Sequence, residues 1–301
     1  MNLKLGILGL SDGNGHPYSW SAIFNGYNPE AMKLCGFPVI PQYLSQQKWP
    51  ESRIKGAKVT SVWSQNQKLS EKIAAATKIS KVVVCPEEMI GSVDAILLAR
   101  DDAENHLELA TPFLKAGLPI YIDKPIALSL KDLSRLYDHQ QYEGQIFSCS
   151  ALKYSHELSL SKEDHIKIGE IRKIIAFTPK SWDKYAVHII EPVLNMLPDF
   201  DEPCDLINGF NKAHQMDLSG SLLVNWHSGI QTSFFALGDG VSPITIRVIG
   251  NKGYKDLYFV DTFSAFKSSL QDFVTRVVNK SSLSDKKFHE LVVKLIEKGR
   301  G

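Results

Sequence analysis

The sequence predicts an α/β protein with two domains: an amino-terminal domain built on a parallel sheet, and a carboxyl-terminal α+β domain with an open, mainly antiparallel sheet. Three observations predict this fold class. Strand-type and helix-type segments alternate through the first half of the chain, which is typical of βαβ units. After Gly144, strand-type segments joined by short polar turns dominate. The length of 301 residues favours two cores over one.

The elements of the first domain follow from apolar runs and the residues that flank them. Buried strand patterns are found at residues 3–10, 58–64, 82–84, 93–99 and 118–122. Helix patterns are found at residues 18–26, 69–78, 103–116 and 129–141, with Gly117 placed to end the third helix and Ser129 to begin the fourth. We expect a first domain over residues 1–126 and a second over residues 127–301, with the helix at 129–141 bridging them.

An insertion over residues 28–56 separates the first helix from the second strand. Its prolines exclude a continuous helix, and they stand at Pro29, Pro38, Pro41 and Pro50. A connection of this length is unusual in a compact domain. It is either a functional lid, an interface, or an ordered surface excursion without chemistry.

The second domain is predicted from strand patterns at residues 145–153, 171–178, 219–226, 231–237 and 244–249. The polar connections "HSG" (227–229) and "GDG" (238–240) suggest turns of an antiparallel sheet. Two helices, at about 263–279 and 284–298, follow the last of these strands.

Composition and charge narrow the function classes. With 34 basic and 33 acidic residues, no basic field favours nucleic acid or a membrane surface, so we expect a small-molecule partner. The four cysteines (Cys35, Cys85, Cys149 and Cys204) are scattered and are interpreted as buried thiols of a cytoplasmic protein. The amino terminus is read as a first strand rather than a signal peptide, and the histidines show no metal-ligand spacing.

A glycine-rich turn, "GLSDGNGHPYSW", follows the first strand, and glycines there let the backbone approach a diphosphate. Gly9 matches the first glycine of G-x-G-x-x-G, whereas Ser11 and Asn14 occupy the next two glycine positions and Gly13 is displaced. Asp12 would repel a diphosphate unless it turns outward. The loop therefore indicates either dinucleotide binding or a tight structural turn.

The end of the second strand carries neutral side chains. The usual pattern has an acid there for a ribose hydroxyl, or a nearby arginine for a 2′-phosphate. This chain has Ser64, Gln65 and Asn66, which do not discriminate between NAD and NADP.

The block "VDAILLARDDAENHLELATPFLKAGLPIYIDKPIALS" resembles the glucose-fructose oxidoreductase, inositol dehydrogenase and rhizopine-catabolism (Gfo/Idh/MocA) family. The shared features are the first strand of the block, His106 at the start of the following helix, and "IDKP" where the family has EKP. "KIGEIRKIIAF" (167–177) is similar to the opening of the family's substrate-domain sheet, so the resemblance covers most of the chain. It implies that the first domain is a Rossmann-type dinucleotide-binding domain.

The resemblance implies that Lys124 stands at the carboxyl edge of this sheet, beside the nicotinamide and the substrate hydroxyl. Pro125 restricts Lys124 to extended conformations, and in the family the peptide between them is often cis. Asp123, Arg100 and His106 are included among the expected cofactor-binding residues. The alternative is a surface ion pair between Asp123 and Lys124, with Pro125 starting a turn.

A second catalytic region is implied by "SWDKYAVHIIEPVLNML". His188 aligns with the histidine of the family motif D-x-G-x-H-x-x-D and Glu191 with its last acid, but Lys184 replaces the usual aspartate and Ala186 the glycine. Lys184 and His188 are four residues apart, hence on one helical face, and both can look into one cleft. The alternative for His188 is a hydrogen-bonded histidine in an apolar helix.

Four further residues are candidates for substrate binding. Lys153 and Tyr154 are expected at the end of the first strand of the second domain, where the family often has a basic contact. Trp182 and Tyr185 are candidates for stacking on a sugar ring, although aromatic residues near a helix start are more often part of a core.

The resemblance implies an oxidoreductase that uses NAD or NADP and moves a hydride to or from a sugar, sugar derivative or polyol. It also implies a homodimer or homotetramer. His188 is expected to exchange the hydroxyl proton, with Lys124 orienting the oxygen and Lys184 assisting or binding an anionic substituent. The alternative is a catalytically silent sensor or scaffold, because Ser11 and Lys184 replace family residues. An enzyme whose glycine loop has shifted to fit a modified substrate is a third hypothesis.

Overall fold

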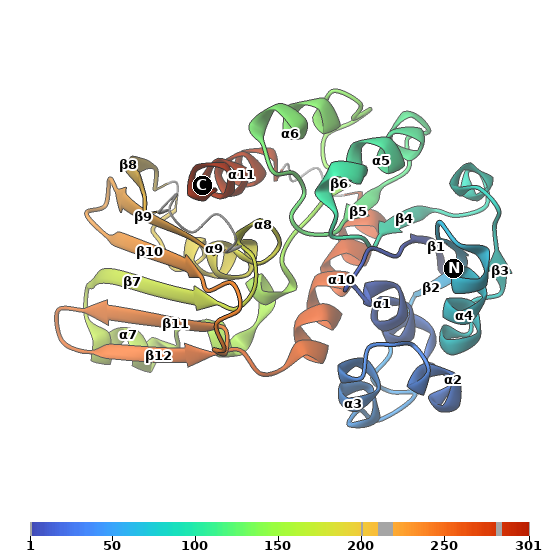
Figure 1. Ribbon diagram of the computed structural model, residues 1–301, viewed down its shortest axis with the longest axis horizontal. Helices are drawn as coiled ribbons and strands as arrows, with labels where there is room; N and C mark the ends of the chain where they lie inside the picture. Colours follow the sequence, from blue (N-terminus) through green and yellow to red (C-terminus); the bar gives the residue numbers. More distant parts are fainter. Residues whose placement is uncertain (1, 200, 210–218, 281–284, 301) are drawn as a thin grey trace. The chain divides into compact units, whose positions relative to one another are not determined.

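The computed structural model describes residues 2–199, 201–209, 219–280 and 285–300 (Figure 1). The chain forms two compact units. Unit 1 comprises Met1–Ala127, Lys131–Cys149 and Phe266–Lys287, and unit 2 comprises Leu128–Leu130, Ser150–Ala265 and Phe288–Gly301. The domain limits expected from the sequence stay a prediction.

Unit 1 is built on a six-stranded sheet with the order β3-β2-β1-β4-β5-β6, and every pair in it is parallel. The strands are β1 (Leu3–Leu8), β2 (Ala57–Trp63), β3 (Lys81–Val82), β4 (Ala95–Leu98), β5 (Ile120–Ile122) and β6 (Ile146–Phe147). All residues of β4 and β5 are buried, which explains their unbroken apolar runs. The predicted parallel sheet is confirmed.

The order reverses at β1, whose neighbours are β2 and β4. In open α/β sheets, ligands bind outside the carboxyl ends of the strands at such a switch point. The segments that follow β1, β4 and β5 therefore form the edge at which a ligand is expected.

The helices of unit 1 are α1 (His16–Asn25), α4 (Gln67–Thr77), α5 (His106–Lys115), α6 (Leu130–Tyr137) and α10 (Thr262–Asn279), with 3-10 turns η1 (Pro86–Met89) and η2 (Ala103–Asn105). Most of α10 packs in unit 1, although it follows the antiparallel sheet in sequence. Phe273 of α10 lies 5.6 Å, centroid to centroid, from the rings of Tyr121 and Phe147. These contacts fill the face of the parallel sheet beside α1.

The insertion contains two short helices, α2 (Pro29–Lys33) and α3 (Val39–Ser45), so its prolines do prevent a continuous helix. It supports the glycine-rich turn. A Cβ built on Gly15 would lie 2.6 Å from Cδ1 of Ile40 and 2.8 Å from Cγ of Phe37. Gly15 is therefore required by the close approach of the insertion to the start of α1.

The predicted strand at residues 145–153 is wrong in length and in sheet. Only β6 is extended, and it pairs in parallel with β5 in unit 1. Ser150 then caps the 3-10 helix η3 (Ala151–Tyr154) by accepting a hydrogen bond from the Leu152 N–H. A serine side chain that bonds to nearby backbone competes with strand pairing, which explains the early end.

Unit 2 contains a six-stranded sheet with the order β12-β11-β7-β10-β9-β8. Its strands are β7 (Ile171–Thr178), β8 (Pro203–Asn208), β9 (Gly220–Trp226), β10 (Gln231–Ala236), β11 (Thr245–Gly250) and β12 (Tyr254–Tyr258). The predicted open, mainly antiparallel sheet is confirmed. The "GDG" turn does not close a hairpin, because β7 lies between β10 and β11 and pairs with β10 in parallel.

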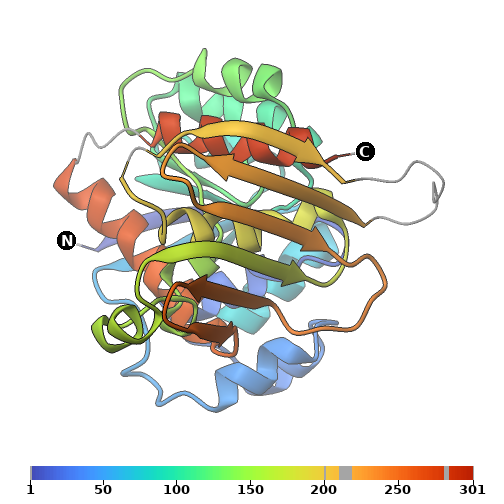
Figure 2. The same cartoon turned by 90° about the vertical axis from the view of Figure 1, so that its left-hand side faces the viewer.

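The helical segments of unit 2 are η4 (His156–Leu158), α7 (Lys162–Ile168), α8 (Trp182–Tyr185), α9 (Val187–Leu194) and α11 (Lys286–Gly299). Helices α9 and α11 contribute to one core with the buried residues of the sheet. Figure 2 shows the opposite face of the sheet, over which none of the described helices lies. Phe177 and Phe235 stack there with centroids 5.4 Å apart.

The cysteine prediction is wrong in part. Cys35 and Cys149 are buried, but Cys85 and Cys204 are exposed, because Cys85 follows the end of β3 and Cys204 lies on the edge strand β8. Within the described residues, no helix is long and apolar enough to cross a membrane.

Candidate functional site

The β1–α1 loop shows why the glycines of the irregular motif are needed. A Cβ on Gly9 would lie 2.1 Å from Cγ of Pro17, so the end of β1 and the first turn of α1 pack too closely for any other residue. Gly13 has φ +74° and faces open space. The loop is therefore tightly packed at Gly9 and open at Gly13.

Ser11, at the second glycine position, is turned into the protein. Its hydroxyl donates a 2.7 Å hydrogen bond to Oδ1 of Asp101, and it accepts the Asp101 N–H at 3.1 Å. Both side chains are buried, whereas Asp12 is exposed. Gln65 forms a second connection to this loop: its side-chain amide accepts a hydrogen bond from the Leu10 N–H and donates one to the Leu10 carbonyl. These bonds connect the loops after β1, β2 and β4.

The loop also offers backbone donors to an anion. In the described part of the chain, the N–H groups of Asp12, Gly13 and Gly15 make no hydrogen bond. The His16 N–H is already taken by Oδ1 of Asn14 at 2.8 Å. A loop with several unbonded N–H groups is an anion-binding concavity, so these residues fit the diphosphate of a dinucleotide.

Asp123 and Lys124 lie at the end of β5 and are both buried. The Asp123 carboxylate accepts hydrogen bonds from the Asn14 amide at 2.9 Å and the Lys124 N–H at 2.8 Å, and it lies 2.5 Å from Nδ1 of His16. Nζ of Lys124 lies 3.7 Å from Oδ2 of Asp101. A surface ion pair between Asp123 and Lys124 is therefore excluded. The peptide from Lys124 to Pro125 is cis.

Three predicted cofactor-binding residues have their polar groups engaged within the protein. The Ser64 hydroxyl bonds to the Asn66 carbonyl at 2.8 Å. His106 is fully buried, with its ring nitrogens 3.1 and 2.8 Å from the carbonyl oxygens of Ile126 and Arg100. Arg100 bonds to Gln65 at 3.0 Å and to Asp102. The side chains of Ser64 and His106 therefore bond to backbone carbonyls of the loops at the carboxyl ends of the strands.

Asp102 anchors the loop after β4. Burial acts to raise the pKa of its carboxyl group, but hydrogen bonds from Arg100 and Asn105 outweigh burial and lower that pKa below its ordinary value.

In unit 2, His188 is held by a short network at the start of α9. The Ser150 hydroxyl lies 2.7 Å from Nδ1 of His188, and the Ser150 N–H donates to the buried Glu191 at 2.9 Å. Tyr185 places its ring edge-on at 5.3 Å. The imidazole is therefore oriented from both sides, and His188 is a half-buried residue rather than a core histidine.

Lysines gather near this histidine along the chain. Ala186 separates α8 from α9, but its φ and ψ are helical, so Lys184 and His188 keep their spacing of one helical turn. Lys180 has φ +67° and exchanges two backbone hydrogen bonds with Gly238. Its ammonium donates to the Tyr185 hydroxyl at 2.5 Å. Lys180 thus reaches the aromatic ring that contacts His188.

The other predicted substrate residues differ in their surroundings. Lys153 and Tyr154 lie in the 3-10 helix η3 and not at the end of a strand. Nζ of Lys153 lies 3.9 Å from the centre of the Phe288 ring, and Tyr154 is half-buried. Trp182 is 2% exposed, donates to the Ile296 carbonyl at 2.8 Å and packs on Gly220. Trp182 is a core residue and does not present its ring to a sugar.

Sequence reasoning missed Asp101, His16, Ser150 and Lys180. No local pattern marks them, since Asp101 and Ser150 gain importance only through partners 90 and 38 residues away. The segment "NGHP" gives a weak signal for His16, because it places a histidine directly after the glycine loop.

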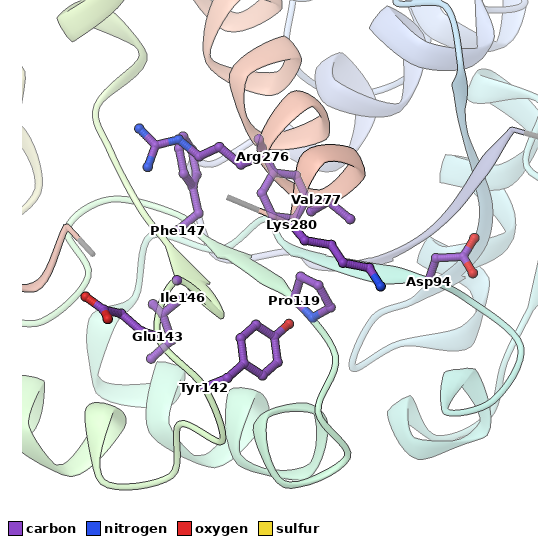
Figure 3. A pocket seen from close by; sticks show the side chains of 11 residues that line it. Asp94, Pro119, Tyr142, Glu143, Ile146, Phe147, Arg276, Val277 and Lys280 are labelled. Atoms are coloured by element: carbon purple, nitrogen blue, oxygen red, sulfur yellow. The ribbon is translucent and has the colours of Figure 1, made fainter. Parts of the chain in front are cut away.

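A cavity of about 470 Å³ in unit 1 lies at the other edge of the parallel sheet (Figure 3). Asp94 and Pro119, which precede β4 and β5, line it together with Tyr142 and Lys280. Arg276 also lines it, but forms salt bridges with Asp272 and Asp285 at 3.1 and 2.7 Å. The cavity is therefore separate from the edge that carries the glycine loop and Lys124.

The fold and these residues define a class: a Rossmann-type dinucleotide-binding unit joined to an α+β unit with an open sheet. Residues 37–150 match the model of the Gfo/Idh/MocA family, which is described as "Oxidoreductase family, NAD-binding Rossmann fold", so this segment is similar to that family. A curated relative, inositol 2-dehydrogenase 1 of Saccharopolyspora erythraea, is 32% identical over 95 residues. That match spans 31% of this chain and 28% of the relative.

Solved structures match nearly the whole chain at low identity and so show the fold. Myo-inositol 2-dehydrogenase of Lactobacillus plantarum is 14% identical, with 99% of this chain and 96% of that chain covered and a TM-score of 0.71. Scyllo-inositol dehydrogenase of Lactobacillus casei with NAD(H) and scyllo-inositol is 16% identical, with 98% and 95% covered and a TM-score of 0.66. UDP-N-acetylglucosamine 3-dehydrogenase of Acidithiobacillus ferrooxidans is 14% identical, with 100% and 97% covered and a TM-score of 0.69.

Proposed function

We propose that this protein is an NAD(P)-dependent oxidoreductase that moves a hydride between nicotinamide and a carbinol or ketone carbon of a sugar, sugar derivative or polyol. The observation that carries the proposal is the carboxyl edge of the unit 1 sheet. The buried Lys124 and a loop with unbonded N–H groups at Asp12, Gly13 and Gly15 stand at one switch point. The similar proteins named above are dehydrogenases of inositols and of a nucleotide sugar, and this supports the substrate class.

The bound nicotinamide would supply the hydride acceptor or donor. The N–H groups of the β1–α1 loop would bind the diphosphate. Lys124 would orient and polarise the substrate oxygen, with Asp101 3.7 Å from its Nζ as counter-charge. His188 would exchange the hydroxyl proton through Nε2, the ring nitrogen opposite the one that Ser150 contacts.

Lys184, together with Lys180, would bind an anionic substituent of the substrate. Lys153, Tyr154 and Tyr185 would contact the rest of it.

A silent sensor or scaffold is the second candidate. The Ser11–Asp101 bond favours it, because a buried acid next to the glycine loop adds negative charge near the diphosphate position. Lys124 offsets that charge, and the relatives are named as dehydrogenases, so the enzyme is the better supported candidate.

The assembly and the compartment belong to the same proposal. A homodimer would form through the uncovered face of the unit 2 sheet, where Phe177 and Phe235 stack, and a homotetramer would pair two such dimers. Four free cysteines, two of them exposed, favour a reducing compartment such as the cytoplasm.

Fluorescence titration with NADH and NADPH tests the proposal. We expect saturable binding of at least one of them, followed by turnover on a panel of inositols and nucleotide sugars. Binding of a nucleotide without turnover on any polyol or sugar would favour the sensor. Failure to bind either dinucleotide would overturn the enzyme assignment.

A further inference from the structure

His16 is a polar residue at the carboxyl edge of the unit 1 sheet to which neither the sequence nor the relatives give a role. It is the first residue of α1, directly after the glycine-rich turn. Its imidazole stacks on Trp20 with centroids 5.1 Å apart and meets Phe266 edge-on at 4.9 Å. The side chain keeps 18% of its surface exposed. These contacts fix the plane of the ring and leave one end accessible.

Asp123 determines which ring nitrogen of His16 is the accessible one. Its carboxylate is 1% exposed, and a buried carboxylate needs hydrogen-bond donors. The Asn14 amide, the Lys124 N–H and Nδ1 of His16 are those donors. Nδ1 must therefore carry a hydrogen, and Asn14 locks the same arrangement by accepting the His16 N–H at 2.8 Å. Within the described chain, Nε2 of His16 has no hydrogen-bond partner.

The sheet order indicates which part of a dinucleotide would meet this nitrogen. In this fold the adenosine half lies over the strand that follows the glycine loop in sequence, here β2, and the diphosphate lies at the start of α1. The other half then extends toward β4 and β5, on the far side of β1. His16 links the start of α1 to Asp123 at the end of β5, so a dinucleotide bound in this way would place its nicotinamide ribose beside His16.

We infer that His16 is a cofactor-binding residue whose Nε2 accepts a hydrogen bond from a hydroxyl of the nicotinamide ribose, with Asp123 as its positioning residue. This inference rests on the proposed function, since it requires a dinucleotide. In this arrangement the Asp123 carboxylate orients the imidazole of His16 and does not itself contact the cofactor.

Calorimetric titration of NADH, ADP-ribose and ADP into the whole protein tests the inference. ADP lacks the second ribose, whereas NADH and ADP-ribose carry it. His16→Asn keeps an amide donor at the Nδ1 position for Asp123. It removes the ring acceptor, because the asparagine side chain is too short to reach the Nε2 position. We expect it to weaken NADH and ADP-ribose about 10-fold, the range of one lost hydrogen bond, and to leave ADP within about 2-fold. His139→Asn, in the same unit, is the matched control and should change the binding of none of the three ligands.

Two results would overturn the inference. Unchanged NADH and ADP-ribose binding by His16→Asn would show that Nε2 contacts no ribose. An equal loss for ADP would show that the substitution disturbs the whole loop, and thermal unfolding of the same sample would reveal that. A wild-type protein that binds none of the three ligands instead refutes the proposed function itself, and the inference with it.

Discussion

The hydroxyl of Ser11 and the carboxylate of Asp101 are 2.7 Å apart and both buried, which ties the glycine-rich turn to the end of β4. The Asp101 carboxylate also lies 3.7 Å from Nζ of Lys124. Asp101 therefore contacts both the glycine-rich turn and Lys124, and we expect the site to lose stability when Asp101 or one of these partners is changed.

The first prediction concerns that bond. Ser11→Ala removes a donor to a buried carboxylate, and we expect the free energy of unfolding to fall by about 2 kcal/mol. Urea unfolding measures it. Ser134→Ala, on an exposed position of α6, should change it by less than about 0.5 kcal/mol. A loss for Ser11→Ala as small as that of the control would show that Asp101 finds another donor.

Lys124→Met should lower kcat by about 10²–10⁴ while NADH affinity changes only a few-fold, because the residue acts on the substrate oxygen. Steady-state kinetics and fluorescence titration give the two quantities. Lys115→Met, exposed at the end of α5, is the matched control and should behave as wild type. Full turnover in Lys124→Met would remove Lys124 from the reaction.

His188→Gln should also lower kcat by about 10²–10⁴, because it removes the group that exchanges the proton. Ser150→Ala should lower kcat by only about 10-fold, because it keeps the imidazole and removes only the contact that orients the ring. The KM for substrate should stay within about 3-fold in Ser150→Ala if Ser150 acts through His188. His165→Gln, exposed in α7, serves as the control. A Ser150→Ala enzyme with normal kcat would contradict the positioning role.

Asp164 gives a prediction about pH. It closes the capping box of α7 with Ser161 and lies 3.1 Å from Nζ of Lys255. Backbone hydrogen bonding from Ser161, followed by Lys255, lowers the pKa of Asp164 to about 2 from 3.8. A lowered pKa in the folded state stabilises the protein above the unfolded value, and this contribution is lost as pH falls through the folded value. Asp164→Asn should therefore lower Tm at pH 7, and the difference from wild type should shrink between pH 4 and pH 2. A difference that stays constant over that range would contradict the assignment.

Phe235→Glu should convert the proposed dimer into monomers, because it buries a charge in the apolar face on which Phe177 stacks. Sedimentation velocity reports the assembly state. Val241→Asp, at a fully exposed position after β10, should leave the assembly unchanged. A wild-type protein that sediments as a monomer would refute the dimer directly.

Local pattern predicted the parallel sheet well. Strands with both faces covered are apolar at every position, so β4 and β5 can be recognised without knowledge of their neighbours. In β9 and β10 buried residues alternate with less buried ones, because only one face of their sheet packs on the core. The residue at which β6 ends could not be recognised from the sequence. Ser150 can either continue a strand or cap a turn, and its contacts in the folded protein determine that it caps η3.

By itself, the sequence was enough to predict the fold class, the resemblance to an NAD-binding oxidoreductase family, and the place of Lys124 at the end of a buried strand. These depend on residues close together in the chain. Three features follow from the three-dimensional fold alone: β7 lies between β10 and β11, most of α10 packs in unit 1, and the Lys124 ammonium faces Asp101. Each of these depends on which buried groups find partners across large separations in sequence, and no local pattern encodes that choice.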